Sequence, residues 1–531
     1  MTHIDLTTRP FDDHFVRHLP ADPSTRPGVR QVHEAIYSLV QPTPVAAPRL
    51  LGWSDSLAAE LGIARPAPDS PALLALAGNT VLPGMRPYAA CYGGHQFGHW
   101  AGQLGDGRAI NLGEWLTTDG KRYELQLKGA GPTPYSRRAD GRAVLRSSLR
   151  EFLCSEAMHH LGIPTSRALS LVASGDTVIR DMFYDGHPEA EPGAIVCRVA
   201  PSFVRFGHFE IHASRADTAL VKHLADYVIT TQFPELGTEF GTLGPAVYAH
   251  WFTRICQRTA RLVAHWMRVG FVHGVLNTDN MSILGLTIDY GPYGWLDGYE
   301  PGWTPNTTDA EGRRYCFANQ PQIAHWNLAR LAQAIAPLVD DAAALDAGLA
   351  AYSETFNATH SEHLAAKLGL ARLARPGHPD DSALISELFA LLQRQETDYT
   401  VFFRRLADVD LSATEPARSA PLMAAYYAPI NAETQHALDG WLTRYHARVL
   451  SDPSDPTTRR ARMNRANPAF ILRNYLAVGA IEAASRGDTG ELEKLLHALQ
   501  NPYTETDTYK LQCRPEWARH KAGCSALSCS S

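Results

Sequence analysis

The sequence contains no uninterrupted run of about 18 apolar residues, the length that an α-helix needs to cross a bilayer. Residues 1–20 also lack the apolar core of a secretory signal. They carry Asp5, Asp12 and Asp13, which transit peptides usually avoid. We therefore expect a cytoplasmic protein with no membrane partner.

Cysteine is scarce and scattered, with 8 residues in a chain of 531. No two cysteines form a C-x-x-C pair, which argues against a structural zinc site. Several lie in apolar segments and are expected to be buried thiols, whereas Cys524 and Cys529 lie in a small, polar C-terminal tail. The eight are Cys91, Cys154, Cys197, Cys256, Cys316, Cys513, Cys524 and Cys529.

An excess of basic residues is also absent, because 49 Lys and Arg stand against 55 Asp and Glu and give a formal net charge of −6. Nucleic-acid binding draws most of its affinity from cationic side chains, so we expect no nucleic-acid partner. The chain has no low-complexity tract and no internal repeat, and 45% of its residues are hydrophobic. Such a chain can bury a large core, and its length favours several domains or two lobes with additions.

The composition and the hydrophobic pattern of the sequence change along the chain. Residues 1–84 are rich in proline and turns, and we interpret them as an extension that wraps a main domain. Residues 85–210 combine strand patterns with one long helix, residues 211–500 are mostly helical, and residues 501–531 form a tail. This order predicts an α+β fold with two lobes, as in protein kinases, and with helical additions toward the C-terminus.

Hydrophobic periodicity places the individual elements. The expected strands are residues 109–112, 123–128, 168–172, 177–183 and 194–200. The expected helices are residues 54–61, 142–161, 216–231, 246–269, 323–338, 343–368 and 382–406, with a loop-and-strand insert at residues 270–295.

Glycines crowd the window of residues 92–108, directly before the first expected strand. Because glycine has no Cβ, its backbone can approach a phosphate and adopt turns that other residues avoid. The six glycines of this window could supply such a phosphate-binding backbone, and they are Gly93, Gly94, Gly98, Gly102, Gly105 and Gly107. An ordinary glycine-rich loop is the alternative interpretation.

Cationic side chains follow that could neutralise phosphate charge. Lys128 ends an expected strand, and Glu151 lies on the small, polar face of the next helix, where a carboxylate can reach and orient a strand lysine. Arg198 and Arg205 have the planar fork that suits phosphate oxygens. The alternative is that all four are surface charges that never meet.

The most specific pattern lies in the loop-and-strand insert. Asp279 and Asn280 close a polar loop, and a short apolar segment then leads to Asp289, which begins an Asp-Tyr-Gly sequence. An asparagine and an aspartate that flank a hairpin are the groups with which kinases hold magnesium. His273 begins a counterpart of the kinase His-Arg-Asp motif, but Val275 stands where the kinase base would be. A chance Asn- and Asp-rich loop is the alternative.

With these motifs the chain resembles the selenoprotein O (SelO) family of protein adenylyltransferases, which were once classed as pseudokinases. The resemblance covers residues 92–321 and returns at residues 467–477 and at the C-terminal Ser-Cys-Ser-Ser. Its most specific segments are residues 104–109, 128–137 and 273–280.

The resemblance implies a kinase-like fold in which ATP lies flipped, so that the α-phosphate faces the attacking hydroxyl and pyrophosphate leaves. Asp279 then matches the catalytic base, and Asn280 and Asp289 match ligands of Mg²⁺ or Mn²⁺. Asp289 also belongs to the nucleotide site. The other nucleotide-binding positions carried over are Gly105, Gly107, Arg108, Lys128, Asp140, Gly141, Arg198 and Arg205, with Glu151 as the partner of Lys128.

The activity expected from this resemblance is the transfer of AMP from ATP to Ser, Thr or Tyr hydroxyls of proteins by a monomeric enzyme. UMP transfer from UTP stays open, as does the choice between the two metals. Phosphoryl transfer of the ordinary kinase type and a catalytically silent nucleotide-binding scaffold are the rival functions. Val275 argues against the first, and the complete set of site residues argues against the second.

One departure from the family concerns redox control. Family members often carry a cysteine in the loop after the metal-binding motif, which is thought to pair with a cysteine or selenocysteine near the C-terminus. Pro305 occupies that position here, while Cys529 remains. Cys316 or Cys524 could pair with Cys529 instead, or the thiol could be inert.

Overall fold

The strand patterns of the β-rich half pair into one antiparallel sheet. The computed structural model describes residues 3–373 and 379–528, and within them this sheet has seven strands in the order β1-β3-β6-β7-β9-β8-β2. They are β1 (Tyr37–Leu39), β2 (Arg49–Trp53), β3 (Tyr88–Ala90), β6 (Ala109–Leu116), β7 (Arg122–Lys128), β8 (Arg167–Arg180) and β9 (Glu189–Ala200).

One long strand replaces two predicted ones. β8 runs through both residues 168–172 and residues 177–183 as far as Arg180. Its register with β9 shifts between Ala173 and Thr177, where Gly175 has a φ of 77°. The strand therefore bulges at the glycine instead of ending there.

The N-terminal residues supply the strands at both edges of the sheet and the short helices that precede β3. β1 pairs with β3 at one edge, and β2 pairs with β8 at the other. The predicted helix at residues 54–61 is α2 (Asp55–Leu61), whose first turn is capped by Ser54 and which ends at Gly62 in the left-handed region. Two more short helices are α1 (His14–His18) and α3 (Pro71–Leu76). The domain boundary at residue 84 stays a prediction.

α4 (Leu145–His160) corresponds to the predicted helix at residues 142–161 and packs against β8 and β9. Leu149, Phe152 and Leu153 form its apolar stripe and are fully buried. Glu151 is buried as well. A helix with a buried carboxylate needs a buried cation beside it, which the sheet provides.

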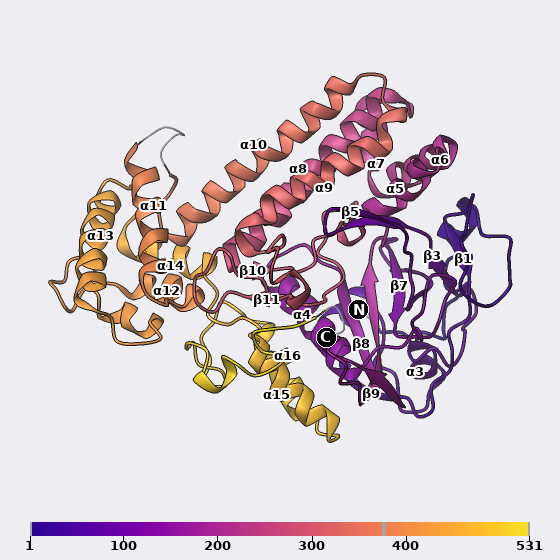
Figure 1. Ribbon diagram of the computed structural model, residues 1–531, viewed down its shortest axis with the longest axis horizontal. Helices are drawn as coiled ribbons and strands as arrows, with labels where there is room; N and C mark the ends of the chain where they lie inside the picture. Colours follow the sequence, from indigo (N-terminus) through magenta and orange to yellow (C-terminus); the bar gives the residue numbers. More distant parts are fainter. Residues whose placement is uncertain (1–2, 374–378, 529–531) are drawn as a thin grey trace.

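The second half is helical, as predicted, so the α+β class is confirmed. α8 and α10 are its longest helices and run side by side (Figure 1). The helices up to this point are α5 (Phe206–Ser214), α6 (Thr218–Gln232), α7 (Pro234–Phe240), α8 (Pro245–Val269), α9 (Gln320–Ile335) and α10 (Ala342–Lys367). In the part of the chain that the structure describes, no helix combines the length and the apolarity needed to span a membrane.

The predicted helix at residues 382–406 is wrong, because the structure has two helices there. α11 (Pro379–Arg394) ends before Asp398, and the Asp398 side chain accepts a hydrogen bond from the Val401 N–H at 3.0 Å and starts α12 (Tyr399–Arg405). The remaining helices are α13 (Ala432–Leu450), α14 (Pro456–Ala466), α15 (Asn474–Ser485) and α16 (Gly490–Leu499). α15 and α16 return to the β-rich half and pack on α4 (Figure 1).

Two small hairpins lie between the sheet and the helices. β4 (Gly93–Gln96) and β5 (His99–Gln103) form the first, in the glycine-rich window that was predicted as a turn. β10 (Phe271–Val272) and β11 (Gly294–Trp295) pair at the two ends of the predicted loop-and-strand insert. The hairpins bring the glycine-rich window and the polar loop together.

Candidate active site

A cavity of about 590 Å³ gathers most of the predicted site residues. It is lined by residues of the glycine-rich window, the sheet and the polar loop. Among the predicted residues, its lining includes Gly105, Gly107, Arg108, Lys128, Arg198, Asp279, Asn280 and Asp289. Glu151 and Arg205 lie behind this lining and contact it, as described below.

Lys128 and Glu151 meet at the back of the cavity. The Lys128 Nζ atom lies 2.7 Å from Glu151 Oε2, and the Glu151 side chain is only 2% exposed. Strand β7 directs Glu124, Gln126 and Lys128 to one face because side chains alternate along a strand. Arg198, from the neighbouring strand β9, reaches the second oxygen of Glu151 at 3.1 Å. Glu151 therefore orients two cations at once.

Asp289 is the electrostatic centre of the site. Arg198 and Arg205 each donate to one of its carboxylate oxygens, and Lys128 Nζ lies 3.8 Å away. Burial alone would raise the pKa of Asp289, but the guanidinium groups of Arg205 and Arg198 outweigh it and hold the pKa well below its usual range. Asp289 is therefore ionised at neutral pH and balances a cluster of three cations.

The backbone at Asp289 is in an unusual conformation, with a φ of 56°. A non-glycine residue in this left-handed region is uncommon and is held there by its surroundings. Here the ion pairs with Arg198 and Arg205 hold the carboxylate at the cavity wall.

Asp279 lies in a short 3₁₀ turn, Thr278–Asn280, at the floor of the cavity. Its Oδ2 atom accepts a hydrogen bond from Gln96 Nε2 at 3.2 Å, while its Oδ1 atom is buried without a hydrogen-bond partner among the described residues. Burial raises the pKa of Asp279 to about 7. A carboxylate with a raised pKa and one unoccupied oxygen has the properties of a general base.

Asn280 and Asp289 offer hard oxygen ligands to a divalent cation. Asn280 Nδ2 donates to the Val275 carbonyl at 2.8 Å, which leaves the side-chain oxygen of Asn280 available. No group of three or more His, Cys, Asp or Glu side chains that could hold a metal occurs within residues 3–373 and 379–528. One amide and one carboxylate suit Mg²⁺ or Mn²⁺ only where phosphate oxygens supply further ligands. The residues present fit a metal–nucleotide complex.

Asp140 and Gly141 do not line the cavity, but they lie in the chain between Ala139 and Arg142, which do. Asp140 pairs with Arg180 at 2.6 Å, and Arg142 and Arg180 line the cavity beside it. Gly141 has a φ of 72°, and a Cβ there would lie 2.1 Å from the carbonyl carbon of Gly131. The backbone of Gly131 therefore leaves no room for a Cβ at position 141, which requires glycine.

The hairpin β4–β5 holds the polar loop, a contact that the sequence did not predict. His95 N donates to Thr278 Oγ1 at 2.7 Å, and Phe97 N donates to Asn277 Oδ1 at 3.2 Å. Together with the bond between Gln96 and Asp279, three successive hairpin residues fix three successive loop residues. The polar residues between the glycines were the available signal, because a plain phosphate-binding turn does not need them.

Gln126 and Asp106 were also missed. Gln126 accepts from Arg198 through its Oε1 atom and donates through its Nε2 atom to Asp106 Oδ2 at 3.3 Å. Both residues are buried and orient Arg198 from the side opposite Asp289. The signal was present in β7, where polar residues alternate with Leu125 and Leu127 in a strand that is buried on both faces.

The end of the described chain docks beside Pro305. Leu527 N donates to the Pro305 carbonyl at 2.8 Å, and Thr307 N donates to the Leu527 carbonyl at 2.7 Å. Between these bonds, Asn306 Nδ2 donates to the Gly274 carbonyl of the polar loop at 3.0 Å. The tail is thus connected to the site by backbone pairing where the family's disulfide is expected.

Cys529 lies outside the described residues. Cys316 and Cys524, the two expected alternative partners, are buried free thiols, and the seven cysteines that the structure describes form no disulfide with one another. Pairing of Cys529 with either thiol stays a prediction.

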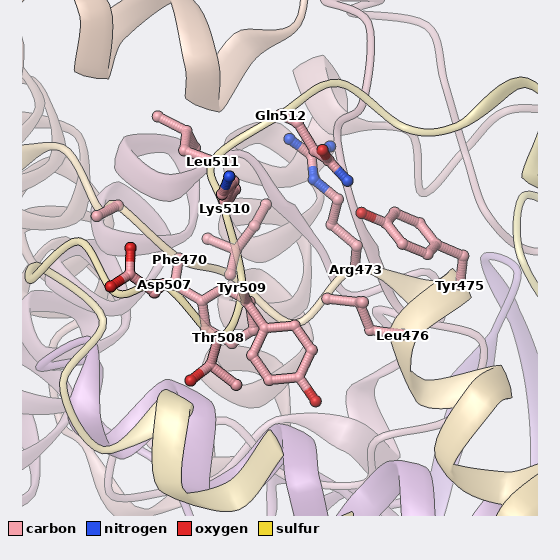
Figure 2. Close-up of a pocket in the computed structure, with 12 residues that line it drawn as sticks. Phe470, Arg473, Tyr475, Leu476, Asp507, Thr508, Tyr509, Lys510, Leu511 and Gln512 are labelled. Carbon is pink, nitrogen blue, oxygen red and sulfur yellow. The ribbon is translucent and has the colours of Figure 1, made fainter. Parts of the chain in front are cut away.

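A second cavity, of about 300 Å³, lies between residues 469–476 and the C-terminal residues 507–512 (Figure 2). Its lining contains none of the predicted site residues. Arg473 on its wall is engaged in ion pairs with Asp297 at 2.5 Å and Asp398 at 2.9 Å. The nucleotide-site residues therefore belong to the first cavity alone.

Comparison with known proteins gives one consistent result. The family model described as "Protein adenylyltransferase SelO" matches residues 23–500. The protein nucleotidyltransferase YdiU of Nitrosospira multiformis is 59% identical over an aligned length of 558. The alignment covers 99% of this chain and 97% of that protein. The proteins of the same name from Aromatoleum aromaticum and Xanthomonas axonopodis pv. citri are 57% and 56% identical. The first alignment covers 98% of this chain and 99% of the relative, and the second covers 100% of both.

Proposed function

The chain belongs to the SelO family of protein adenylyltransferases, and on this premise we propose that it transfers AMP from ATP to Ser, Thr or Tyr hydroxyls of proteins and releases pyrophosphate. The observation that carries the proposal is the cavity in which three cations surround Asp289 while Asp279 keeps one oxygen unoccupied. Such a site can bind a polyphosphate and accept a proton.

For the nucleotide we propose a flipped orientation in a kinase-like fold. Lys128, Arg198 and Arg205 would hold the distal phosphates, because guanidinium and ammonium groups stabilise phosphate charge. Gly105, Gly107 and Arg108 would lie against the nucleotide, and a Cβ at Gly105 would meet the Tyr135 side chain at 2.4 Å. Asp140 and Gly141 would form a further contact beside the cavity.

In the reaction, the acceptor hydroxyl attacks the α-phosphorus and its proton passes to Oδ1 of Asp279. A new oxygen–phosphorus bond forms, and the bond to the β-phosphate oxygen breaks, so pyrophosphate leaves with the electron pair. Gln96 holds the other oxygen of Asp279 and fixes the direction of proton transfer. A Mg²⁺ or Mn²⁺ ion held by Asn280 and Asp289 would neutralise phosphate charge when bound.

Two rival functions use parts of the same site. Ordinary phosphoryl transfer would need a base near the γ-phosphate, but Val275 stands at the position of the kinase base. A catalytically silent scaffold would not need a carboxylate with an unoccupied oxygen, a lysine oriented by a glutamate, or ligands for a metal. UTP differs from ATP only in its base, so UMP transfer uses the same phosphate contacts.

We expect label from [α-³²P]ATP, but not from [γ-³²P]ATP, to become covalently attached to protein. Holding the distal phosphates on Lys128, Arg198 and Arg205 leaves the α-phosphate as the group transferred. The measurement is acid-stable label on the chain and on an acceptor protein, with [α-³²P]UTP run in parallel. Preferential transfer of the γ label would overturn the proposal and favour a kinase.

We expect Lys128→Ala and Glu151→Ala to be coupled. Each should lower turnover by about 100-fold, since each removes or misplaces a cation at the phosphates. The double variant should lose little more than the worse single variant, because Glu151 acts by orienting Lys128. The measurement is a double-mutant cycle on the initial rate of AMP transfer.

A matched control is the ion pair between Arg146 and Glu191, which joins α4 to β9 at 2.6 Å and does not line the cavity. Removing that pair should leave turnover within about twofold, because neither side chain lines the cavity. Fully additive losses at Lys128 and Glu151 would mean that the two side chains act independently.

A further inference from the structure

Beside the hairpin β4–β5, two arginines stack on one tryptophan. The guanidinium carbons of Arg314 and Arg330 each lie 4.8 Å from the centroid of the Trp326 ring. The His95 ring meets Trp326 edge-on with centroids 5.5 Å apart, and Trp100 lies 5.1 Å from His95. We call Trp100, Arg314, Trp326 and Arg330 the Trp–Arg surface.

Neither arginine has a carboxylate within ion-pair distance among the described residues, although Arg314 is attracted by Asp309 over a longer distance. In the same part of the chain, the Nε atom of each is buried without a hydrogen-bond partner. The two nearby carboxylates are already engaged. Asp309 accepts the backbone N–H groups of Arg314 and Tyr315, and Glu210 pairs with His95 at 2.6 Å. Two stacked cations without a close carboxylate partner, in a chain of net charge −6, mark a site for an anionic partner.

The Trp–Arg surface adjoins the proposed base. Gln96 in β4 reaches Asp279, and two residues further along, a Cβ at Gly98 would lie 3.4 Å from the guanidinium carbon of Arg314. An extended polypeptide advances about 3.3 Å per residue, so this offset corresponds to about two residues of a bound segment. A protein whose hydroxyl reaches Asp279 would therefore place neighbouring residues over Arg314 and Arg330.

We propose that the Trp–Arg surface binds an acidic segment of the protein substrate, with Asp or Glu residues beginning about two positions from the acceptor hydroxyl. This inference rests on the proposed function, since it places the acceptor hydroxyl at Asp279. Stacking on Trp326 holds the two guanidinium groups in place and lowers the entropy cost of pairing with carboxylates. Trp100, which is 39% exposed, adds apolar contact beside them.

The test compares three serine peptides that differ only in the residues two to five positions on each side of serine. These residues are Asp and Glu in the first peptide, Asn and Gln in the second, and Lys in the third. The full-length chain is measured for AMP transfer from [α-³²P]ATP and, without nucleotide, for binding of the fluorescein-labelled peptides by anisotropy. We expect about a tenfold preference in kcat/KM for the acidic peptide over the neutral one, as two partly exposed charge pairs provide. The preference should weaken as salt is raised.

In Arg314→Ala/Arg330→Ala the preference should fall below about twofold, and in Arg314→Glu/Arg330→Glu it should turn toward the lysine peptide. Arg465→Ala/Arg486→Ala is the matched control, because both arginines are exposed on α14 and at the end of α15, away from the cavity. ATP affinity and melting temperature identify variants that fail to fold. For such variants, Arg314→Gln/Arg330→Gln replaces the alanine pair.

An alanine pair that folds and keeps the full acidic preference would overturn the proposal. So would stronger competition by a single-stranded oligonucleotide than by the acidic peptide at equal charge. The anisotropy measurement separates this inference from the proposed function. Acidic peptide that binds through Arg314 and Arg330 but receives no AMP would contradict the transferase activity alone, whereas AMP transfer without peptide preference would contradict the Trp–Arg surface alone.

Discussion

Asp279→Asn should lower the rate of AMP transfer by about 1,000-fold and leave ATP affinity within about threefold. Asparagine has the size of aspartate and can still contact Gln96, but it cannot accept a proton from the acceptor hydroxyl. In the proposed binding mode ATP would contact the cations around Asp289, whose carboxylate this substitution leaves in place. Single-turnover transfer from [α-³²P]ATP measures the first effect, and calorimetric titration of nucleotide measures the second.

The matched control for this variant is Asp119→Asn, in a turn between β6 and β7 that does not line the cavity. It should transfer AMP at the rate of the unsubstituted chain. If Asp279→Asn kept more than a tenth of that rate, Asp279 would not be the base, and the proton would have to leave through another group.

Asp289→Ala should abolish AMP transfer and also destabilise the fold. The substitution leaves Arg198 and Arg205, which are 3% and 1% exposed, without the carboxylate that both contact. Removing one partner of a buried ion pair typically costs about 3–5 kcal/mol, because the remaining charge stays buried. Urea denaturation should show this loss, and transfer assays over a range of Mn²⁺ and Mg²⁺ concentrations should show no recovery.

Asn280→Ala should be milder than Asp289→Ala. Asn280 offers a hard cation only a neutral carbonyl oxygen, whereas Asp289 offers a full negative charge. We expect added metal to restore part of the activity of Asn280→Ala, with unchanged stability in urea. Undiminished activity in Asp289→Ala would show that Asp289 does not belong to the site. Equal losses in Asp289→Ala and Asn280→Ala would show that the charge of Asp289 does not make it the more important metal ligand.

The sequence predicts which residues gather at the candidate site better than it predicts the contacts that position them. Lys128, Glu151 and Asp289 could be found because each stands in a motif with a fixed local setting, at a strand end, on a helix face or after a hairpin. The contacts of Gln96 and Gln126 could not be predicted, because their partners Asp279 and Arg198 are 183 and 72 residues away. Such contacts depend on how the hairpin and the sheet pack, which local patterns do not encode.

The same reason explains the errors in the fold. Residues 382–406 have a continuous helical pattern, and only the cap made by the Asp398 side chain separates α11 from α12. Residues 168–183 were divided at the Gly175 segment, yet pairing with β9 carries the strand through it. In both places a tertiary or capping contact outweighed the local periodicity.

The docking of Leu527 beside Pro305 determines how the tail can be released. Two backbone hydrogen bonds and one buried leucine contribute about 3–6 kcal/mol together, before the entropy cost of ordering the tail. Contacts of this kind open and close by thermal fluctuation, so temperature and denaturant act on them directly. The amides of Thr307 and Leu527 should therefore exchange with solvent deuterium together, as one opening unit.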